Sequence, residues 1–134
     1  MKVVIDTNVI ISGVFFGGPP ALILKAWHDG VLQLVVSPEI LEEYYEVCER
    51  ISVRHPDVDI TRILVLIAHY SQVVEAPPLA EQVSRDSDDD KFIACAVASD
   101  TQIIISGDND LLTVSDYESV QVLTPREFVD KHIP

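Results

Sequence analysis

The chain has 134 residues, of which 48% are hydrophobic, and 22 acidic against 9 basic side chains give a formal net charge of −13. This length and composition suit one domain with a substantial core, so we expect a single domain over residues 1–134. The acidic balance argues against a general nucleic-acid-binding surface, because a negatively charged surface repels a polyanion. Any polyanionic substrate must therefore be bound locally, by bound cations or by a few placed Lys and Arg side chains.

The first half of the chain alternates short apolar strands with helices. A strand over 3–5 comes first, and Pro19-Pro20 then opens a helix that Gly30 ends. A second strand over 32–36 leads into Ser37-Pro38, the N-cap and first-turn proline of a helix that runs to about Ile51. A third helix over 60–70 and a short strand at 72–75 follow.

The second half continues the alternation. An acidic cluster at 86–90 opens a helix through 92–97, strands follow at 103–105 and 120–123, and a short helix spans 125–129. Continuous apolar strands are typical of a parallel sheet covered on both faces. The pattern therefore predicts an α/β fold: a three-layer α/β/α sandwich with a central, mainly parallel sheet.

Single acids follow two of these strands. Asp6 ends the first strand, and Asp108 and Asp110 follow the strand at 103–105. In open α/β sheets the carboxyl ends of strands point into the crevice where ligands bind. Each position is also typical of an ordinary Asx turn or helix cap, and this interpretation stays open for each acid taken alone.

The helices add further acids. Glu43 lies three residues after Ile40 and four before Val47, which places it at the border of a buried helix face. Asp89 lies three residues before Phe92, above the core-facing side of its helix. Four acids lie within positions 86–90, namely Asp86, Asp88, Asp89 and Asp90.

Capping explains one or two acids at a helix start, because the free amides and the helix dipole favour negative charge there. Four like charges this close repel one another unless a cation screens them. Carboxylate clusters suit hard cations such as Mg²⁺. Arg85 and Lys91 flank the cluster, and we expect both to be solvated side chains rather than phosphate ligands.

Four motifs, in this order and spacing, resemble those of PIN-domain nucleases, and within them the prokaryotic group of toxins from toxin–antitoxin systems. They are Val4-Ile-Asp-Thr-Asn-Val-Ile10, Ser37-Pro-Glu-Ile-Leu-Glu-Glu43, Asp86-Ser-Asp-Asp-Asp-Lys-Phe-Ile-Ala-Cys-Ala96 and Ser106-Gly-Asp-Asn-Asp-Leu-Leu112. The resemblance covers residues 2 to about 128.

The resemblance implies a PIN fold and Mg²⁺- or Mn²⁺-dependent hydrolysis of RNA phosphodiesters that leaves a 5′-phosphate and a 3′-hydroxyl. It implies a catalytic, metal-binding quartet of Asp6, Glu43, Asp89 and Asp108. It also implies an RNA substrate and a possible cognate antitoxin whose basic segment enters the site. The supporting positions are Asn8, Asp86, Asp90, Ser106 and Asp110. The third acid falls on Asp89 or Asp90, and we prefer Asp89, since it keeps the acid three residues before a large apolar side chain.

Other functions remain open from the residues alone. A phosphoacceptor receiver domain has a similar acidic pocket, but it needs an acidic pair after the first strand, where this chain has Asp6 followed by Thr7. A solitary PIN nuclease in RNA processing is one alternative. A non-catalytic acidic module that binds a basic partner segment is another.

The remaining features are interpreted structurally. Cys48 and Cys95 lie in apolar helical patterns without metal-type spacing, so we expect reduced core thiols in a cytoplasmic protein. No apolar run approaches the ~18 residues of a membrane span. The segment 15–20 reads as a loop in which at least one Phe packs into the core. Four aromatic side chains are assigned to the core or to an interface, namely Trp27, Tyr44, Tyr45 and Tyr70. We also expect the chain to form a homodimer.

Overall fold

The computed structural model describes residues 1–134, and its centre is a five-stranded, all-parallel sheet. The strands are β1 (Lys2–Ile5), β2 (Gln33–Val36), β3 (Gln72–Val73), β4 (Ile103–Ile105) and β5 (Gln121–Leu123). The helices are α1 (Thr7–Phe15), α2 (Pro19–His28), α3 (Pro38–Ser52), α4 (Ile60–Tyr70), α5 (Asp90–Ala98), α6 (Asn109–Leu112) and α7 (Pro125–His132), with a 3₁₀ turn, η1 (Ser87–Asp89), before α5.

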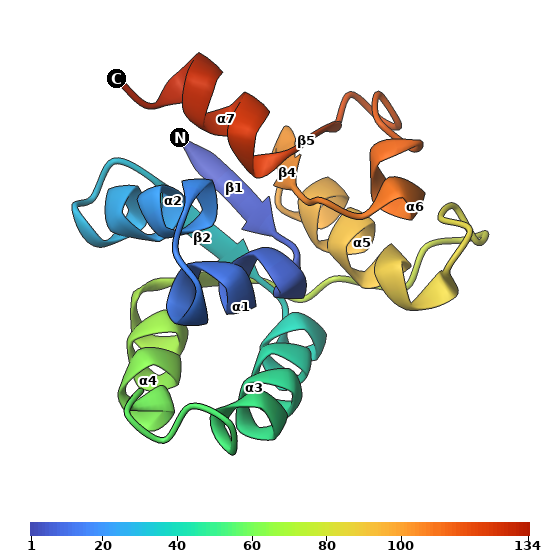
Figure 1. Cartoon of the computed structure of the whole chain (residues 1–134). Helices are drawn as coiled ribbons and strands as arrows, with labels where there is room; N and C mark the ends of the chain where they lie inside the picture. Colours follow the sequence, from blue (N-terminus) through green and yellow to red (C-terminus); the bar gives the residue numbers. More distant parts are fainter.

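The strand order is β3-β2-β1-β4-β5, so β1 is central. From β1 the chain adds β2 and β3 on one side and then β4 and β5 on the other, so the order of strands reverses between β1 and β4. Helix α5 packs on β1, β2 and β4, while α1, α2 and α7 pack together as a separate group of helices (Figure 1). The predicted α/β/α sandwich is therefore confirmed. Ligands in such sheets bind outside the carboxyl ends of the strands at the reversal point. Asp6 and Asp108 follow β1 and β4, the two strands that meet there.

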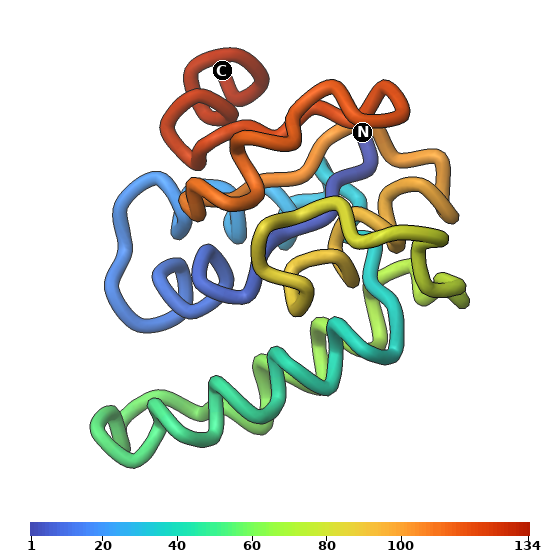
Figure 2. Tube along the Cα trace, turned by 90° about the vertical axis from the view of Figure 1, so that its right-hand side faces the viewer, coloured from blue at the N-terminus to red at the C-terminus, as the bar shows by residue number.

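Helices α3 and α4 form an extended pair that projects from the rest of the molecule (Figure 2). Ser37 caps α3 by accepting from the Ile40 amide at 3.3 Å, as predicted, and Asp59 caps α4 from the Arg62 amide at 3.1 Å. No single helix is long and apolar enough to span a bilayer. Only α1 and α2 taken together have that length and composition, and they are bent by 92° at the break between them.

Helix α1 differs from the sequence expectation. The run Val9-Ile10-Ile11 is apolar on every side, and all three residues are buried, so it lacks the periodicity that marks a surface helix. Gly13 permits α1 to lie close to α2, because a Cβ at this position would come within 2.9 Å of the Pro20 carbonyl oxygen. Phe15 therefore ends a helix rather than lying in a loop. Helix α6 was also not predicted, since four residues are too few for a periodic pattern.

The core is one cluster of 28 buried apolar residues that includes Tyr44, Cys48 and Cys95. Both cysteines are free and buried, which confirms the prediction of reduced core thiols. Tyr45 and Tyr70 are exposed rather than core residues. Phe15 is half-buried and packs on His55 with ring centroids 5.1 Å apart, as expected for at least one of the two phenylalanines.

Candidate metal centre

Two strand ends meet at the carboxyl edge of the sheet through one hydroxyl group. Ser106, which is fully buried, donates from Oγ to Asp6 Oδ2 at 2.7 Å and accepts from the Asp108 amide at 3.0 Å. The Asp6 amide in turn donates to the Ile105 carbonyl at 2.9 Å. These contacts fix Asp6 and Asp108 relative to one another although they lie on different strands.

Helix α6 brings a third carboxylate to the same place. Asp108 is its N-cap and accepts from the Asp110 amide through Oδ1 at 2.9 Å. The chain thus turns sharply after Gly107, and Asp110 lies in the first helical turn beside Asp108. The local capping interpretation and a site role are compatible here, because the cap uses only one oxygen of Asp108.

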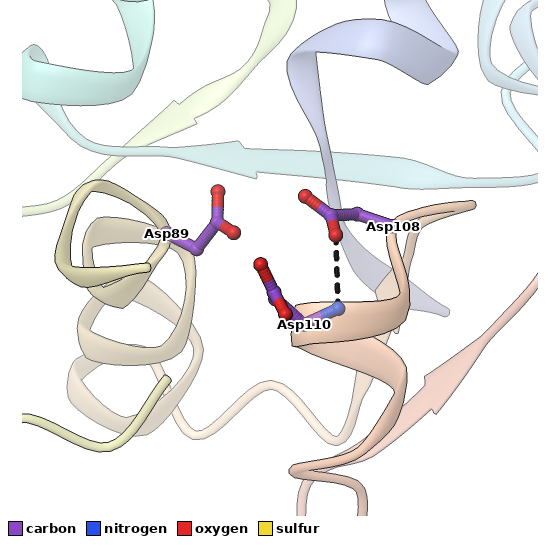
Figure 3. Close-up of side chains that lie close together, drawn as sticks. All are labelled: Asp89, Asp108 and Asp110. Atoms are coloured by element: carbon purple, nitrogen blue, oxygen red, sulfur yellow. Dashed lines mark hydrogen bonds between the residues drawn. The ribbon is translucent and has the colours of Figure 1, made fainter. Parts of the chain in front are cut away.

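Asp89 reaches this pair from the other side. Carboxylate oxygens of Asp89, Asp108 and Asp110 all lie within 4.8 Å of one another. Figure 3 shows Asp89, at the start of α5, directed toward the two acids that flank the start of α6. The Asp89 Oδ2 atom is buried and has no hydrogen-bond partner. A buried, unpartnered carboxylate oxygen beside two further acids fits an oxygen-ligand site for a hard divalent cation.

The electrostatics of this cluster agree with its geometry. Burial, followed by the charges of Asp108, Asp6 and Asp86, raises the pKa of Asp89 to about 7. Burial also raises the pKa of Asp6, assisted by the charges of Asp108 and Glu43 and opposed by the hydrogen bond from Ser106. The acids therefore crowd one another, as the sequence predicted, and a cation among them would relieve the repulsion.

Glu43 approaches from α3, and both of its oxygens have partners. The Thr7 hydroxyl donates to Oε2, and Lys91 Nζ donates to Oε1 at 2.8 Å. Glu43 lies near enough to raise the pKa of Asp6, but it is outside the group of three acids whose oxygens converge. The expectation that Lys91 is an ordinary solvated side chain was wrong: its side chain is 25% exposed and pairs with Glu43.

Asp89 and Asp90 have clearly different surroundings. Asp90 accepts from the Val83 amide through Oδ2 at 3.0 Å and from the Ser84 amide through Oδ1 at 2.7 Å. Its carboxylate thus holds the loop before η1, while that of Asp89 joins Asp108. The geometry favours Asp89 as the acid that shares the site, and it assigns Asp90 to loop support.

Asn8 and Asp86 lie at the margin. Asn8 is exposed and its side chain makes no hydrogen bond within the protein. Asp86 is exposed and caps η1 by accepting from the Asp88 amide at 3.0 Å. Asp86 contributes charge to the surroundings of Asp89.

Besides Thr7 and Lys91, which hold Glu43, two further residues that support the site were missed from the sequence. Ser84 is 1% exposed, and its hydroxyl donates to the Asp110 carbonyl at 3.3 Å. The Tyr44 hydroxyl, fully buried, donates to the Ile5 carbonyl immediately before Asp6. Ser84 lies in a polar loop and carries no sequence signal. Tyr44 could have been suspected only because it is a tyrosine on a buried helix stripe, where its hydroxyl needs a partner.

The acidic cluster at the carboxyl edge of the parallel sheet offers oxygen ligands of the kind that divalent cations prefer. Residues 2–110 match the PIN domain family. The chain belongs to the PIN-domain family, as its four motifs indicated, and PIN domains are generally nucleases, which are hydrolases. The chain is also similar to an uncharacterized protein of Methanocaldococcus jannaschii, with 35% identity over 142 residues that cover 98% of this chain and 91% of that protein.

Proposed function

We propose that this chain is a Mg²⁺- or Mn²⁺-dependent endoribonuclease that hydrolyses RNA phosphodiester bonds. The observation that carries the proposal is the convergence of Asp89, Asp108 and Asp110 around a buried carboxylate oxygen that has no partner. Membership of the PIN-domain family supports the same reaction class.

The residues of the cluster have separate roles in this proposal. Asp89, Asp108 and Asp110 would hold the ion. The carboxylates of Asp6 and Glu43 would complete the catalytic group of acids around it. A divalent ion bound there supplies Lewis-acid activation of water and neutralises charge on a phosphate. Ser106 keeps Asp6 and Asp108 in register. With water activated in this way, the site would require no nucleophilic side chain.

The first test is cleavage of a defined RNA panel by the purified chain with Mg²⁺ or Mn²⁺. We expect cleavage that EDTA abolishes and that added Mn²⁺ restores, with 5′-phosphate and 3′-hydroxyl product ends. Asp89→Asn should lower cleavage by about 100-fold or more, since it removes one full charge from the group that holds the ion. Asp130→Asn, an exposed acid on α7, is the matched control and should cut normally. Activity that persists in EDTA would contradict the proposal.

We further propose that the chain is the toxin of a toxin–antitoxin pair, held inactive by a partner whose basic segment enters the acidic centre, and that it forms a homodimer. The support is the resemblance of the four motifs to that group and the net charge of −13, which suits a basic partner. Expression in a bacterial host should arrest growth, and co-expression of the neighbouring gene should relieve the arrest. Cleavage without growth arrest would favour a solitary nuclease in RNA processing. A partner complex without any cleavage would favour a non-catalytic module.

The proposed homodimer has a separate test, which is the molar mass measured by light scattering after size exclusion.

A further inference from the structure

A cavity that lies beside the Lys91–Glu43 pair has no role in the function proposed above. It holds about 380 Å³ between the loop 76–82 and the first turns of α3 and α5. Lys91 connects the two sites, because its Nζ atom donates to Glu43 on the acidic side while the residue also lines the cavity. The cavity and the acidic side therefore share Lys91 as a common boundary residue.

The walls of the cavity suit a flat, partly apolar group. Ala76, Pro78 and Leu79 contribute apolar surface from the loop, and Ala94 contributes it from α5. The volume lies at the lower end of the range of small-molecule sites, about 300–1,000 Å³. A single unstacked base, the form in which proteins read RNA sequence, is a group of this kind.

The polar groups of the cavity are mainly hydrogen-bond acceptors. Gln82 donates both of its amide contacts to the carbonyls of Ser84 and Arg85, at 3.0 and 3.1 Å, which leaves its Oε1 atom as an acceptor. Glu39 and Glu81 add two exposed carboxylates. The carboxylate of Asp90 also lines the cavity, but two backbone amides already occupy its oxygens. Acceptors of this kind pair with the exocyclic amino groups of bases.

Donors line the cavity as well, and they are the hydroxyl groups of Ser37 and Ser87 and the ammonium group of Lys91. Ser37 caps α3 and is only 1% exposed, whereas Ser87 is exposed, so Ser87 is the more accessible hydroxyl donor. Lys91 supplies the positive charge at the boundary, where a phosphate that links two nucleotides would pass.

We propose that this cavity binds the base of the nucleotide next to the cut phosphate and favours bases with an exocyclic amino group over uracil, while Lys91 contacts the connecting phosphate. This inference rests on the proposed ribonuclease function and adds a substrate subsite to it. It makes the enzyme selective for sequence context although its surface is strongly acidic.

The first test maps cleavage sites on an RNA of random sequence with Mn²⁺. We expect amino-bearing bases to be enriched over uracil by about tenfold at one position beside the cut, the size of one good base-edge contact. Ala80→Trp should abolish this preference, because Ala80 is exposed and lines the cavity, so the indole fills it without disturbing the core. Ala98→Trp, at the exposed end of α5, is the matched control and should keep the preference. Glu81→Gln should reduce it.

The second test does not depend on cleavage. Titration with cytidine 5′-monophosphate should shift the backbone amide NMR signals of Leu79, Ala80 and Ala94, uridine 5′-monophosphate should shift them less, and Ala80→Trp should remove the response. RNA cleavage without base preference, together with no response at these amides, would overturn the inference. A response at these amides without cleavage of any RNA would instead overturn the ribonuclease proposal and leave the nucleotide cavity supported.

Discussion

The edge of the sheet at the carboxyl ends of the strands and the edge at their amino ends carry energetic costs of different kinds. At the carboxyl edge, Asp6, Asp89, Asp108 and Asp110 are crowded, and one buried oxygen lacks a partner. At the amino edge no such group of acids converges, and Lys2 donates to the Ser99 carbonyl at 2.6 Å. The cost there lies in the backbone, where four residues other than glycine have positive φ, namely Asp100, Asp116, Glu118 and Ser119.

This contrast separates a functional cost from a structural one. Electrostatic repulsion at the carboxyl edge disappears when a proton or a cation arrives, so it can be exchanged for ligand binding. Backbone strain at the amino edge is independent of any ligand and can be removed only by changing the residue. Variants at the two edges should therefore respond differently to metal and to pH.

The largest effect is expected at Asp108. Asp108→Asn keeps a side-chain oxygen that can cap α6, but it removes the charge that Asp89 and Asp110 need to hold a cation. We expect RNA cleavage to fall by about 100-fold or more while the circular dichroism spectrum is unchanged. A variant that cuts within twofold of the parent would place the metal elsewhere.

The next effect is expected at Ser106, which joins the two strand ends. Ser106→Ala leaves Asp6 Oδ2 buried without its donor, and this should cost about 1–3 kcal/mol of unfolding free energy, measured by urea denaturation. Cleavage should fall with it, because Asp6 and Asp108 lose their common contact. Ser99→Ala is a matched control at the other end of α5, since Ser99 is also buried and hydrogen-bonded but remote from the acids. Loss of cleavage in the control as well would show that Ser106 acts only through stability.

The pH dependence of stability has a defined sign. In the folded chain the pKa of Asp89 is raised from 3.8 to about 7, so the folded state binds more protons than the unfolded state between these values. Without metal, the contribution of Asp89 to stability should fall as pH rises from about 4 to about 7. Asp89→Asn should remove this part of the pH dependence of the melting temperature. An identical profile for the variant and the parent would contradict the assignment.

The ion pair of Lys91 with Glu43 should matter less for the fold than for the site. Because both side chains are 25% exposed, we expect Lys91→Met to change the unfolding free energy by about 1 kcal/mol or less. It should weaken RNA binding measured with Ca²⁺ and reduce the salt dependence of that binding by about one unit of slope. Lys25→Met, on the exposed face of α2, serves as the control and should leave RNA binding unchanged.

The smallest effect on cleavage is expected at the amino edge. Glu118 and Ser119 have φ of 49° and 65° and connect Tyr117 to Val120, whose amide donates back to the Tyr117 carbonyl at 2.8 Å. Such a two-residue hairpin turn favours glycine at its second position. Ser119→Gly should stabilise the chain by about 1 kcal/mol in thermal unfolding. Cleavage and metal response should stay the same, and a change in either would break the separation of the two edges.

Sequence patterns predicted those parts of the molecule that depend on neighbours along the chain. The apolar strands and the cap of α3 are local, and the position of Asp6 and Asp108 follows from the rule for strand ends. Lys91 and Glu43 lie 48 positions apart, and Ser84 and Asp110 lie 26 apart, so no local pattern could reveal either contact. Helix α1 was missed because its buried residues lack an exposed face, and packing rather than periodicity decides its conformation.

The central claim is that the converging acids form a divalent-metal centre. Calorimetric titration of the chain with Mn²⁺ in the absence of RNA tests it without any reaction. We predict saturable binding by the parent chain and by Asp130→Asn, and loss of that binding in Asp89→Asn and in Asp108→Asn. Binding of equal affinity in all four proteins would contradict the claim.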